Sequence, residues 1–357
     1  HAAVAYVGFE ARSTILRVFP EPLPQTPIPV VTTTSSTTTT VASKPPLVKP
    51  WSVPTSSTST TTTTTIPLGT ERLTILLLGG DAGPGRSGLR TDTVMVATVD
   101  TLSGAAASFG LPRTMAGFRV SDGPEFPGPS RGILNEVYKY GWRHPDRFGG
   151  PDPGINAMRD VVQTTLGIPI DRYILVEMSG FADLVDVMGG VTVNPQSSFD
   201  APLYYEHPEE YEMITFEPGV QHLDGAHALA YARSRTNSND YARMARQRCL
   251  VTSLAASASP LSMMGRLVEL LDLIERRVTT DVPASELPFL INFAPSVASG
   301  EVAFVGFDVD YRTDDRTPQG DPVVDIPLIQ STVASIIQGE IGAEIPNFDL
   351  SESACGL

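Results

Sequence analysis

The most informative part of this chain runs from Gly219 to Leu250 and reads GVQHLDGAHALAYARSRTNSNDYARMARQRCL. It holds arginines at positions 233, 235, 243, 246 and 248, and its acidic residues are Asp224 and Asp240. Because the rigid, five-donor guanidinium fits phosphate oxygens, arginines that converge on one point predict a phosphate or pyrophosphate ligand. The alternative is a solvated charged surface, paired with some of the chain's 40 acidic side chains.

Local patterns place the first two of these arginines after a short helix. Asp224 is a predicted N-cap for a helix over residues 226–231. Arg233 and Arg235 then lie in a segment that we predict to be extended, where alternate residues point to the same side. Two guanidinium groups would therefore face one direction.

A second helix follows, with Asp240 as its predicted N-cap. On that helix Arg243, Arg246 and Gln247 share one face, because positions i, i+3 and i+4 are neighbours on a helix surface. We expect Arg243 to be exposed there, so that its loss would leave the packing of the core intact.

Size and composition limit the class of protein. With 357 residues and 41% hydrophobic residues, the chain can build one large domain or two small ones. It contains no apolar run of about 18 residues, the length of a membrane-spanning helix. The first residue is His1 rather than Met, so we expect a membrane anchor to precede it. A net charge of −15 argues against a nucleic-acid partner.

The sequence divides into four segments. Residues 1–19 form an N-terminal segment that we leave unassigned. Residues 20–70 are rich in Pro, Thr and Ser, which predicts an extended spacer that cannot bury a core. We expect a folded domain over residues 71–345, with its motifs between 73 and 250, and a tail over residues 346–357.

Apolar runs and helical periodicity alternate along the folded domain. The strands predicted from these runs cover residues 74–78, 92–99, 106–111, 173–178, 191–194 and 302–307. The predicted helices cover residues 133–140, 155–166, 181–188, 250–277 with a break at Pro260, and 287–298. This mixture predicts a single α/β (mixed α+β) domain, with a central mixed sheet covered by helices on both sides.

Charged residues stand at the ends of the first three predicted strands. Asp81, Asp92 and Arg113 would lie along one edge of the sheet. Two carboxylates at neighbouring strand ends can hold Mg²⁺ through oxygen ligands, while a pyrophosphate supplies the rest of the shell. The alternative is that each aspartate only caps a turn, where Asp is common.

Another interpretation of the loop that follows the first predicted strand is a phosphate-binding P-loop. Residues 80–87 read GDAGPGRS and follow an apolar strand, with arginine in place of the usual lysine. A P-loop requires a helix directly after it, whose N-terminus binds phosphate. The residues that follow, GLRTDTVMV, predict a strand instead.

Several motifs resemble those of the LytR-CpsA-Psr family. The family signature G-x-x-x-L-x-G-x-x-A-L-x-Y-x-R-x-R matches residues 219–235, and D-x-x-R-x-x-R-Q matches residues 240–247. The family's G-x-D motif resembles the residues that end at Asp81, and R-[ST]-D-T resembles residues 90–93. Arg113 matches the arginine of a P-R-D turn, although Thr114 replaces the aspartate. Residues 135–138 resemble the family's N-E-A-[YF] element.

This resemblance implies an extracytoplasmic, membrane-anchored enzyme of cell wall biogenesis. Such enzymes move a glycopolymer from a polyprenyl-pyrophosphate carrier to peptidoglycan, and here the new link would be a phosphodiester. The frequent arginines and rare lysines are typical of GC-rich genomes, which favours an actinobacterial, arabinogalactan-like polymer. Two alternatives remain: a polyprenyl-pyrophosphate pyrophosphatase, and a non-catalytic module that binds the carrier lipid.

Roles for individual residues follow from the resemblance. Asp81 and Asp92 would bind Mg²⁺ and, with Arg90, form the catalytic group, one aspartate also being a candidate general base. The residues expected to hold the pyrophosphate are Arg113, Arg233, Arg235, Arg243, Arg246 and Gln247.

The chain has two cysteines, Cys249 and Cys355. Neither belongs to a Cys/His pattern of the kind that binds zinc. In an exported protein these two thiols are a candidate disulfide that ties the tail to the helix after the arginines. The alternative is two unrelated thiols.

Overall fold

The computed structural model describes one compact unit of the chain. The described residues are 72–81, 89–101, 103–121, 132–204, 210–236, 240–257, 266–286, 289–290, 302–307 and 309–338. Within these ranges no helix combines the length and the apolar content that a membrane span requires. The predicted spacer over residues 20–70 and the tail over residues 346–357 lie outside them, so these boundaries stay predictions.

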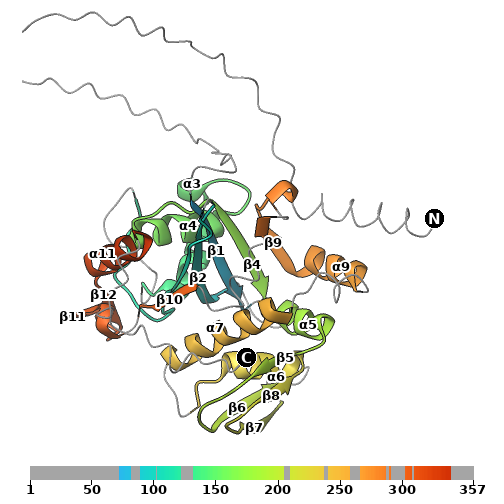
Figure 1. The fold of residues 1–357 in the computed structure, drawn as a ribbon. Helices are drawn as coiled ribbons and strands as arrows, with labels where there is room; N and C mark the ends of the chain where they lie inside the picture. The colour runs from blue at the N-terminus through green and yellow to red at the C-terminus, as the bar shows by residue number, and fades with distance from the viewer. Residues whose placement is uncertain are drawn as a thin grey trace, which may run out of the picture. The chain divides into compact units, whose positions relative to one another are not determined.

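A six-stranded mixed sheet forms the centre of the fold, in the order β10-β3-β2-β1-β4-β9 (Figure 1). The strands are β1 (Arg72–Gly80), β2 (Thr91–Asp100), β3 (Ala106–Gly110), β4 (Arg172–Glu177), β9 (Val278–Thr280) and β10 (Val302–Gly306). β1 pairs antiparallel with β2 and parallel with β4, while β3 pairs antiparallel with β2 and parallel with β10. The mixed sheet is the one predicted.

Alternation along the strands builds two hydrophobic clusters. Leu76, Val96 and Phe109 are fully buried and belong to the larger cluster. Leu73 and Ile75 occupy the other face of β1, because successive side chains of a strand point to opposite sides. Each large apolar side chain in such a cluster contributes roughly 1.5–3 kcal/mol on burial.

Three helices pack against the larger cluster: α2 (Val137–Arg143), α4 (Pro153–Leu166) and α11 (Ile326–Ile337). α4 begins where Asp152 accepts a hydrogen bond from the Ile155 amide at 3.0 Å. It ends at Gly167, whose φ of +72° is the left-handed conformation that favours glycine. The predicted helix over residues 133–140 is instead a 3-10 turn, η1 (Leu134–Glu136), followed by α2 and the short α3 (Pro145–Phe148).

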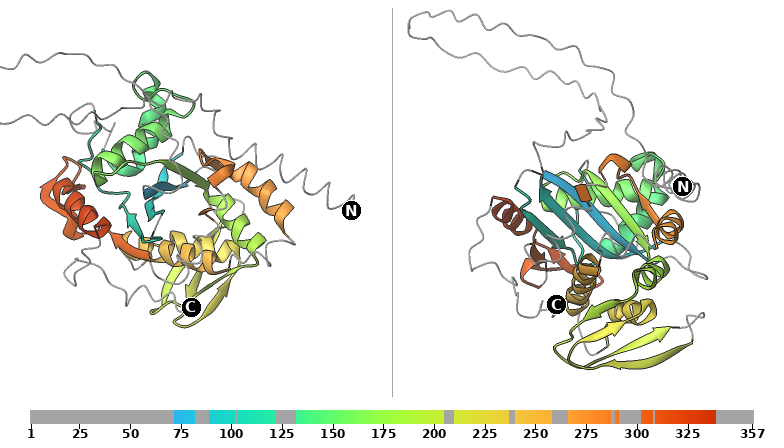
Figure 2. Two further views of the ribbon diagram at one scale, coloured as in Figure 1. Left: turned by 45° about the horizontal axis from the view of Figure 1, so that its top comes forward. Right: turned by 45° about the vertical axis from the view of Figure 1, so that its right-hand side comes forward.

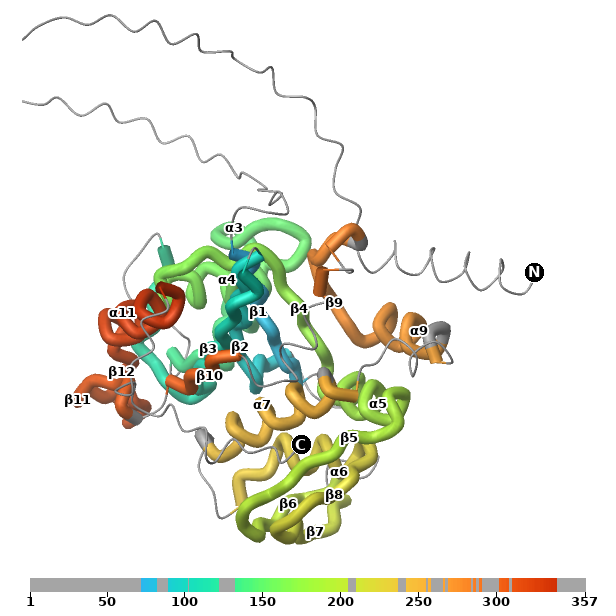
Figure 3. Tube along the Cα trace, in the orientation of Figure 1, coloured from blue at the N-terminus to red at the C-terminus, as the bar shows by residue number. Residues whose placement is uncertain are grey.

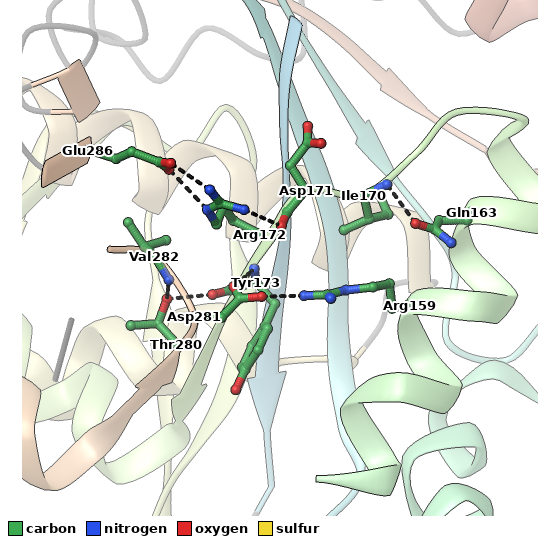
Figure 4. A network of polar contacts seen from close by, with 10 residues as sticks. All are labelled: Arg159, Gln163, Ile170, Asp171, Arg172, Tyr173, Thr280, Asp281, Val282 and Glu286. Atoms are coloured by element: carbon green, nitrogen blue, oxygen red, sulfur yellow. Dashed lines mark hydrogen bonds and ion pairs between the residues drawn. The ribbon is translucent and has the colours of Figure 1, made fainter. Parts of the chain in front are cut away.

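Ion pairs and hydrogen bonds connect β4, α4 and the segment after β9 (Figure 4). Arg172 makes a bidentate pair with Glu286, at 3.0 Å from Nε and 2.6 Å from Nη2. Asp281 accepts from the Tyr173 amide at 2.7 Å and pairs with Arg159 of α4 at 2.5 Å. The Arg172–Glu286 pair is buried, and removal of one partner from such a pair costs about 3–5 kcal/mol, so this pair holds the segment after β9 against β4.

A smaller lobe follows β4 and lies beyond one end of the sheet (Figure 2). Its elements are α5 (Met178–Met188), β5 (Val191–Val193), β6 (Phe199–Tyr204), β7 (Tyr211–Phe216), β8 (Gln221–Leu223) and α6 (Gly225–Arg233). β5 pairs with β8 and β6 pairs with β7. The cluster at its centre includes Phe216 and Tyr231. Gly225 is required at the crossing with α5, because a Cβ there would lie 2.1 Å from the Ala182 carbonyl.

Helix α7 (Asp240–Ser257) joins this lobe to the sheet, as the tube in Figure 3 shows most simply. The remaining described elements are α9 (Leu267–Arg277), η2 (Ala284–Glu286), η3 (Val309–Tyr311), β11 (Arg312–Arg316) and β12 (Pro322–Val324). Pro260, the predicted break after α7, lies outside the described residues. Of the helix predicted over residues 287–298, only residues 289–290 are described, and they are helical.

Candidate functional site

A β-bulge places Asp92 at the end of the sheet where β1 ends and β2 begins. Gly79 pairs with Thr93 but Gly80 pairs with Thr91, so Asp92 is an extra residue on β2. Both glycines are close to other side chains: a Cβ on Gly80 would lie 2.6 Å from Leu89 Cδ1. Bulges are common beside active sites because they redirect one side chain out of the regular alternation.

Asp81 and Arg90 are joined by a backbone hydrogen bond at the same end of the sheet. The Asp81 amide donates to the Arg90 carbonyl at 2.8 Å, directly beyond the last pair of the β1–β2 ladder. The Arg90 side chain is exposed. No helix begins after the loop, since residues 89–90 are not helical and β2 starts at Thr91. The P-loop interpretation therefore lacks the helix that it requires.

Arg113 reaches this edge from the neighbouring strand. The Leu111 amide donates to the Val94 carbonyl at 3.0 Å and carries the chain past the end of β3. Arg113 Nη1 then lies 2.5 Å from Asp92 Oδ1, and the two side chains are only 14% and 12% exposed. The predicted convergence of Asp81, Asp92 and Arg113 at one edge of the sheet is confirmed.

Arg243 reaches the site from α7, 151 residues after Asp92 in the sequence. Its Nη1 donates to the Asp92 carbonyl at 3.0 Å, and the residue is 3% exposed. The helix is seated against the sheet end by Met244, whose Cε would lie 2.8 Å from a Cβ on Gly110. The expectation that Arg243 is exposed was wrong, because its guanidinium also binds the backbone that the bulge displaces.

The segment after α6 differs from the prediction. Arg233 is the last residue of α6 rather than part of an extended run, and its guanidinium lies 4.9 Å from the Tyr204 ring centroid. Ser234 is extended and fully buried, while Arg235 is exposed. The start of the helix is as predicted, since Asp224 caps it by accepting a hydrogen bond from the His227 amide at 2.9 Å.

Arg246 and Gln247 contact α6. Arg246 Nε donates to the Tyr231 carbonyl at 3.1 Å, and Nη2 donates to the Ser234 carbonyl at 2.5 Å. Gln247 Nε2 donates to the Ala232 carbonyl at 3.3 Å. Burial lowers the pKa of Arg246 from its ordinary value, with the charge of Arg243 acting in the same direction. These two side chains were predicted to hold the pyrophosphate, and the structure places them against protein backbone.

Asp81 and Asp92 carry the kind of oxygen ligand that a hard cation prefers. Asp81 and Asp92 stand at adjoining strand ends. η1 packs against β2, and the Asn135 amide donates to the Arg113 carbonyl at 3.1 Å. Asn135 Oδ1 and Glu136 Oε2 are buried and accept no hydrogen bond from the residues described. Mg²⁺ prefers oxygen ligands and is often bound by one or two carboxylates together with substrate phosphates.

A closed metal site made only of protein is not what these residues form. Among the described ranges, no group of three or more His, Cys, Asp and Glu side chains is placed to hold a metal ion. If Asp81 and Asp92 held Mg²⁺, phosphate oxygens and water would have to complete its shell.

Two features of this site were missed from the sequence. The bulge had a signal in the pair Gly79-Gly80 at a strand end, since glycine inside a strand often marks a bulge. The contacts of Arg246 with the backbone had no signal in the sequence, because they depend on where α6 ends.

Cys249 is disulfide-bonded. Its predicted partner, Cys355, lies outside the described residues, so that pairing stays a prediction.

Comparisons with known proteins identify the family of this chain. The LytR_cpsA_psr family matches residues 31–320. TagU of Oceanobacillus iheyensis, named a polyisoprenyl-teichoic acid–peptidoglycan teichoic acid transferase, is 30% identical over 227 residues, which are 63% of each chain. The match thus spans less than two thirds of that relative.

Solved structures show the same fold. Bacillus subtilis TagV superposes with a TM-score of 0.54 at 22% identity, over 75% of this chain and 98% of TagV. Protein gbs0355 of Streptococcus agalactiae gives a TM-score of 0.56 at 20% identity, over 75% of this chain and 88% of that one. With most of its length covered by the family match, this chain belongs to the LytR-CpsA-Psr family.

Proposed function

We propose that this chain is a Mg²⁺-dependent phosphotransferase, which attaches a glycopolymer from a polyprenyl-pyrophosphate carrier to peptidoglycan through a phosphodiester. The observation that carries the proposal is the double attachment of Asp92: Arg113 pairs with its carboxylate and Arg243 binds its carbonyl. Two guanidinium groups are thus held beside a pair of aspartates. The name of TagU, a teichoic acid transferase that acts on peptidoglycan, supports the same class of reaction.

The arginines bind and orient the pyrophosphate. Arg113 and Arg243 are anchored on Asp92, so their remaining donors have a set position before the substrate arrives. Arg90 and Arg235 are exposed and add charge from the start of β2 and from the segment after α6. When bound by Asp81 and Asp92, Mg²⁺ supplies charge neutralisation at the leaving phosphate.

The reaction is a displacement at phosphorus. A hydroxyl oxygen of the acceptor glycan attacks the phosphorus that carries the sugar, and the bond from that phosphorus to the bridging oxygen breaks. Polyprenyl monophosphate leaves, and the glycan phosphate stays on the acceptor as a phosphodiester. The proton of the hydroxyl passes to a carboxylate of the Asp81–Asp92 pair.

We further propose that the protein works on the outer face of the cell membrane, held there by an anchor that precedes the Pro/Thr/Ser-rich spacer. An arabinogalactan-like polymer is the donor glycan that we expect. The composition of residues 20–70 and the rarity of lysine support these two assignments.

The test incubates the purified domain with a polyprenyl-pyrophosphate oligosaccharide and Mg²⁺, with and without peptidoglycan, and follows polyprenyl monophosphate by mass spectrometry. We expect monophosphate only when the acceptor is present. Monophosphate of equal amount without acceptor would identify a pyrophosphatase. Bound lipid with no product in either reaction would identify a binding module. Arabinogalactan-type and teichoic-type donors compared in parallel test the polymer assignment.

A further inference from the structure

Side chains about one turn apart on helix α7 contact two different parts of the structure. Arg243 reaches the sheet and donates to Asp92. Arg246 and Gln247, three and four residues later, reach the last turn of α6. The helix therefore sets the distance between the bulge on β2 and the segment that carries Arg235.

The end of α6 depends on these contacts. The last carbonyl groups of a helix have no partner within the helix and need outside donors. Tyr231 and Ala232 supply two such carbonyls and the next residue after the helix, Ser234, supplies a third; Arg246 donates to Tyr231 and Ser234 at 3.1 and 2.5 Å, and Gln247 to Ala232 at 3.3 Å. The side chains of α7 thus act as the C-terminal cap of α6.

The segment after α6 is also fixed from its other side. Ser234 is fully buried, and its Oγ donates to the Asp200 carbonyl of β6 at 2.6 Å. The guanidinium carbon of Arg246 lies 4.5 Å from the centroid of the Phe199 ring, and Arg246 is 8% exposed. One face of this guanidinium is therefore stacked while two of its nitrogens bind backbone, which is a structural environment rather than a phosphate-binding one.

We infer that Arg246, assisted by Gln247, is a positioning residue: it holds the Ser234–Arg235 segment at a set distance from Arg243 and does not itself bind the pyrophosphate. This inference deepens the proposed function and rests on it. The arginines of the family signature therefore have two roles: some contact the ligand, whereas Arg246 holds the segment that carries Arg235 in position.

Lysine cannot replace arginine in this role. The planar fork of arginine spans the Tyr231 and Ser234 carbonyls at once, whereas the ammonium of lysine is a single point with a flexible stem. Since a misplacement of about 1 Å can reduce catalysis roughly 100-fold, loosening this segment should affect turnover more than ground-state binding. We expect Arg246→Lys to lower kcat about 10- to 100-fold, with KM changed less than about threefold.

The matched control is Arg248→Lys on the same helix, because the Arg248 guanidinium packs over the Phe304 ring of β10, 5.1 Å from its centroid. Hydrogen–deuterium exchange gives a readout that needs no activity. The Ser234 amide, which donates to the Ala230 carbonyl at 3.0 Å, should exchange at least about tenfold faster in Arg246→Lys and at an unchanged rate in Arg248→Lys.

A double-mutant cycle provides the decisive test. If Arg246 acts through Arg235, Arg246→Lys should lower kcat less than about twofold when Arg235 is already lysine. In the Arg113→Lys background, Arg246→Lys should lower kcat by its full factor. Full additivity with Arg235→Lys, or exchange at Ser234 that does not change, would overturn the inference. Should Arg246→Lys fail to fold, Gln247→Met removes only the 3.3 Å contact and should show the same pattern more weakly.

Failure of the proposed function would be recognised separately. In that case wild-type protein would form no transfer product, while the exchange experiment and calorimetric binding of inorganic pyrophosphate would still report on the segment. Weakened pyrophosphate binding by more than about tenfold in Arg246→Lys, with exchange at Ser234 unchanged, would make Arg246 a direct ligand and contradict the positioning role.

Discussion

Arg243 donates a hydrogen bond from Nη1 to the carbonyl of Asp92 at 3.0 Å, across 151 residues of sequence. Asp92 is the extra residue of the bulge on β2, so the arginine binds backbone at the point where the regular ladder is interrupted. The same aspartate pairs with Arg113 through its carboxylate. Asp92 therefore fixes the positions of two guanidinium groups. We expect changes at this position to alter both the stability of the fold and the rate of the reaction.

Arg243→Ala should reduce stability as well as activity. The variant leaves the Asp92 carbonyl without this donor in a buried setting, which costs about 1–3 kcal/mol of unfolding free energy. We expect the rate of transfer to fall at least about 100-fold, since one transition-state donor is lost as well. Urea denaturation measures the first effect and a transfer assay the second.

The control for Arg243→Ala is Arg276→Ala. Arg276 is 60% exposed and pairs with Asp272 of the same helix, so its loss should change stability by less than about 0.5 kcal/mol. Unchanged stability of Arg243→Ala would mean that the contact with Asp92 contributes nothing to the fold, contrary to the structure.

Asp81→Asn should alter the response to metal. The amide keeps the size of the side chain but removes a negative charge that a divalent cation requires. We expect the Mg²⁺ concentration for half-maximal activity to rise at least about tenfold, while the thermal unfolding temperature stays within a few degrees. An unchanged Mg²⁺ titration, measured by activity or by calorimetry, would remove Asp81 from the metal site.

Alkaline pH should weaken the fold through Tyr138. Burial is the main cause that raises the pKa of Tyr138 from 10.0 to about 12, and its hydroxyl donates to Asp152 at 2.9 Å. The unfolded chain loses this proton near pH 10 while the folded chain keeps it to about pH 12, so stability falls as the pH rises through that window.

Tyr138→Phe should remove part of this alkaline loss of stability. Burial also raises the pKa values of Tyr173 and Tyr231, so some pH dependence remains in the variant. Urea denaturation at several pH values between 9 and 12 gives the comparison.

Peptide mapping tests the predicted partner of Cys249. We expect one disulfide-linked peptide that contains Cys249 and Cys355, which disappears after reduction. Removal of a native disulfide typically costs 2–5 kcal/mol, so reduced protein and Cys355→Ser should unfold at similarly lower urea concentrations. A free thiol on Cys355 in the native protein would rule out this pairing.

The strands and most helices could be predicted because their signals are local. The apolar run around Leu76 and the capping aspartate before α6 both act over a few residues, and both appear where expected. The 3-10 turn at Leu134–Glu136 was read as helix, since its apolar spacing resembles that of α2. Propensity does not separate one turn of 3-10 helix from the start of an α-helix.

The site could be predicted only as far as residue type and strand position allow. Asp81, Asp92 and Arg113 share an edge because strand ends determine it. The directions of Arg243 and Arg246 were not accessible, because each depends on a carbonyl exposed by distant structure: the bulge on β2 and the end of α6. Helical spacing predicts that Arg243 and Arg246 share one face of α7, but it does not show which parts of the structure that face contacts.

The most direct test of the account asks which bond the protein breaks. Wild-type domain, a polyprenyl-pyrophosphate oligosaccharide, Mg²⁺ and peptidoglycan are incubated together, and both products are analysed by mass spectrometry. We expect polyprenyl monophosphate together with a glycan joined to peptidoglycan through one phosphate, and we expect both products to be lost in Arg243→Ala. Polyprenyl pyrophosphate together with a glycan joined through a plain glycosidic bond would show attack at the sugar carbon, and would contradict a phosphotransferase built on the Asp92 bulge.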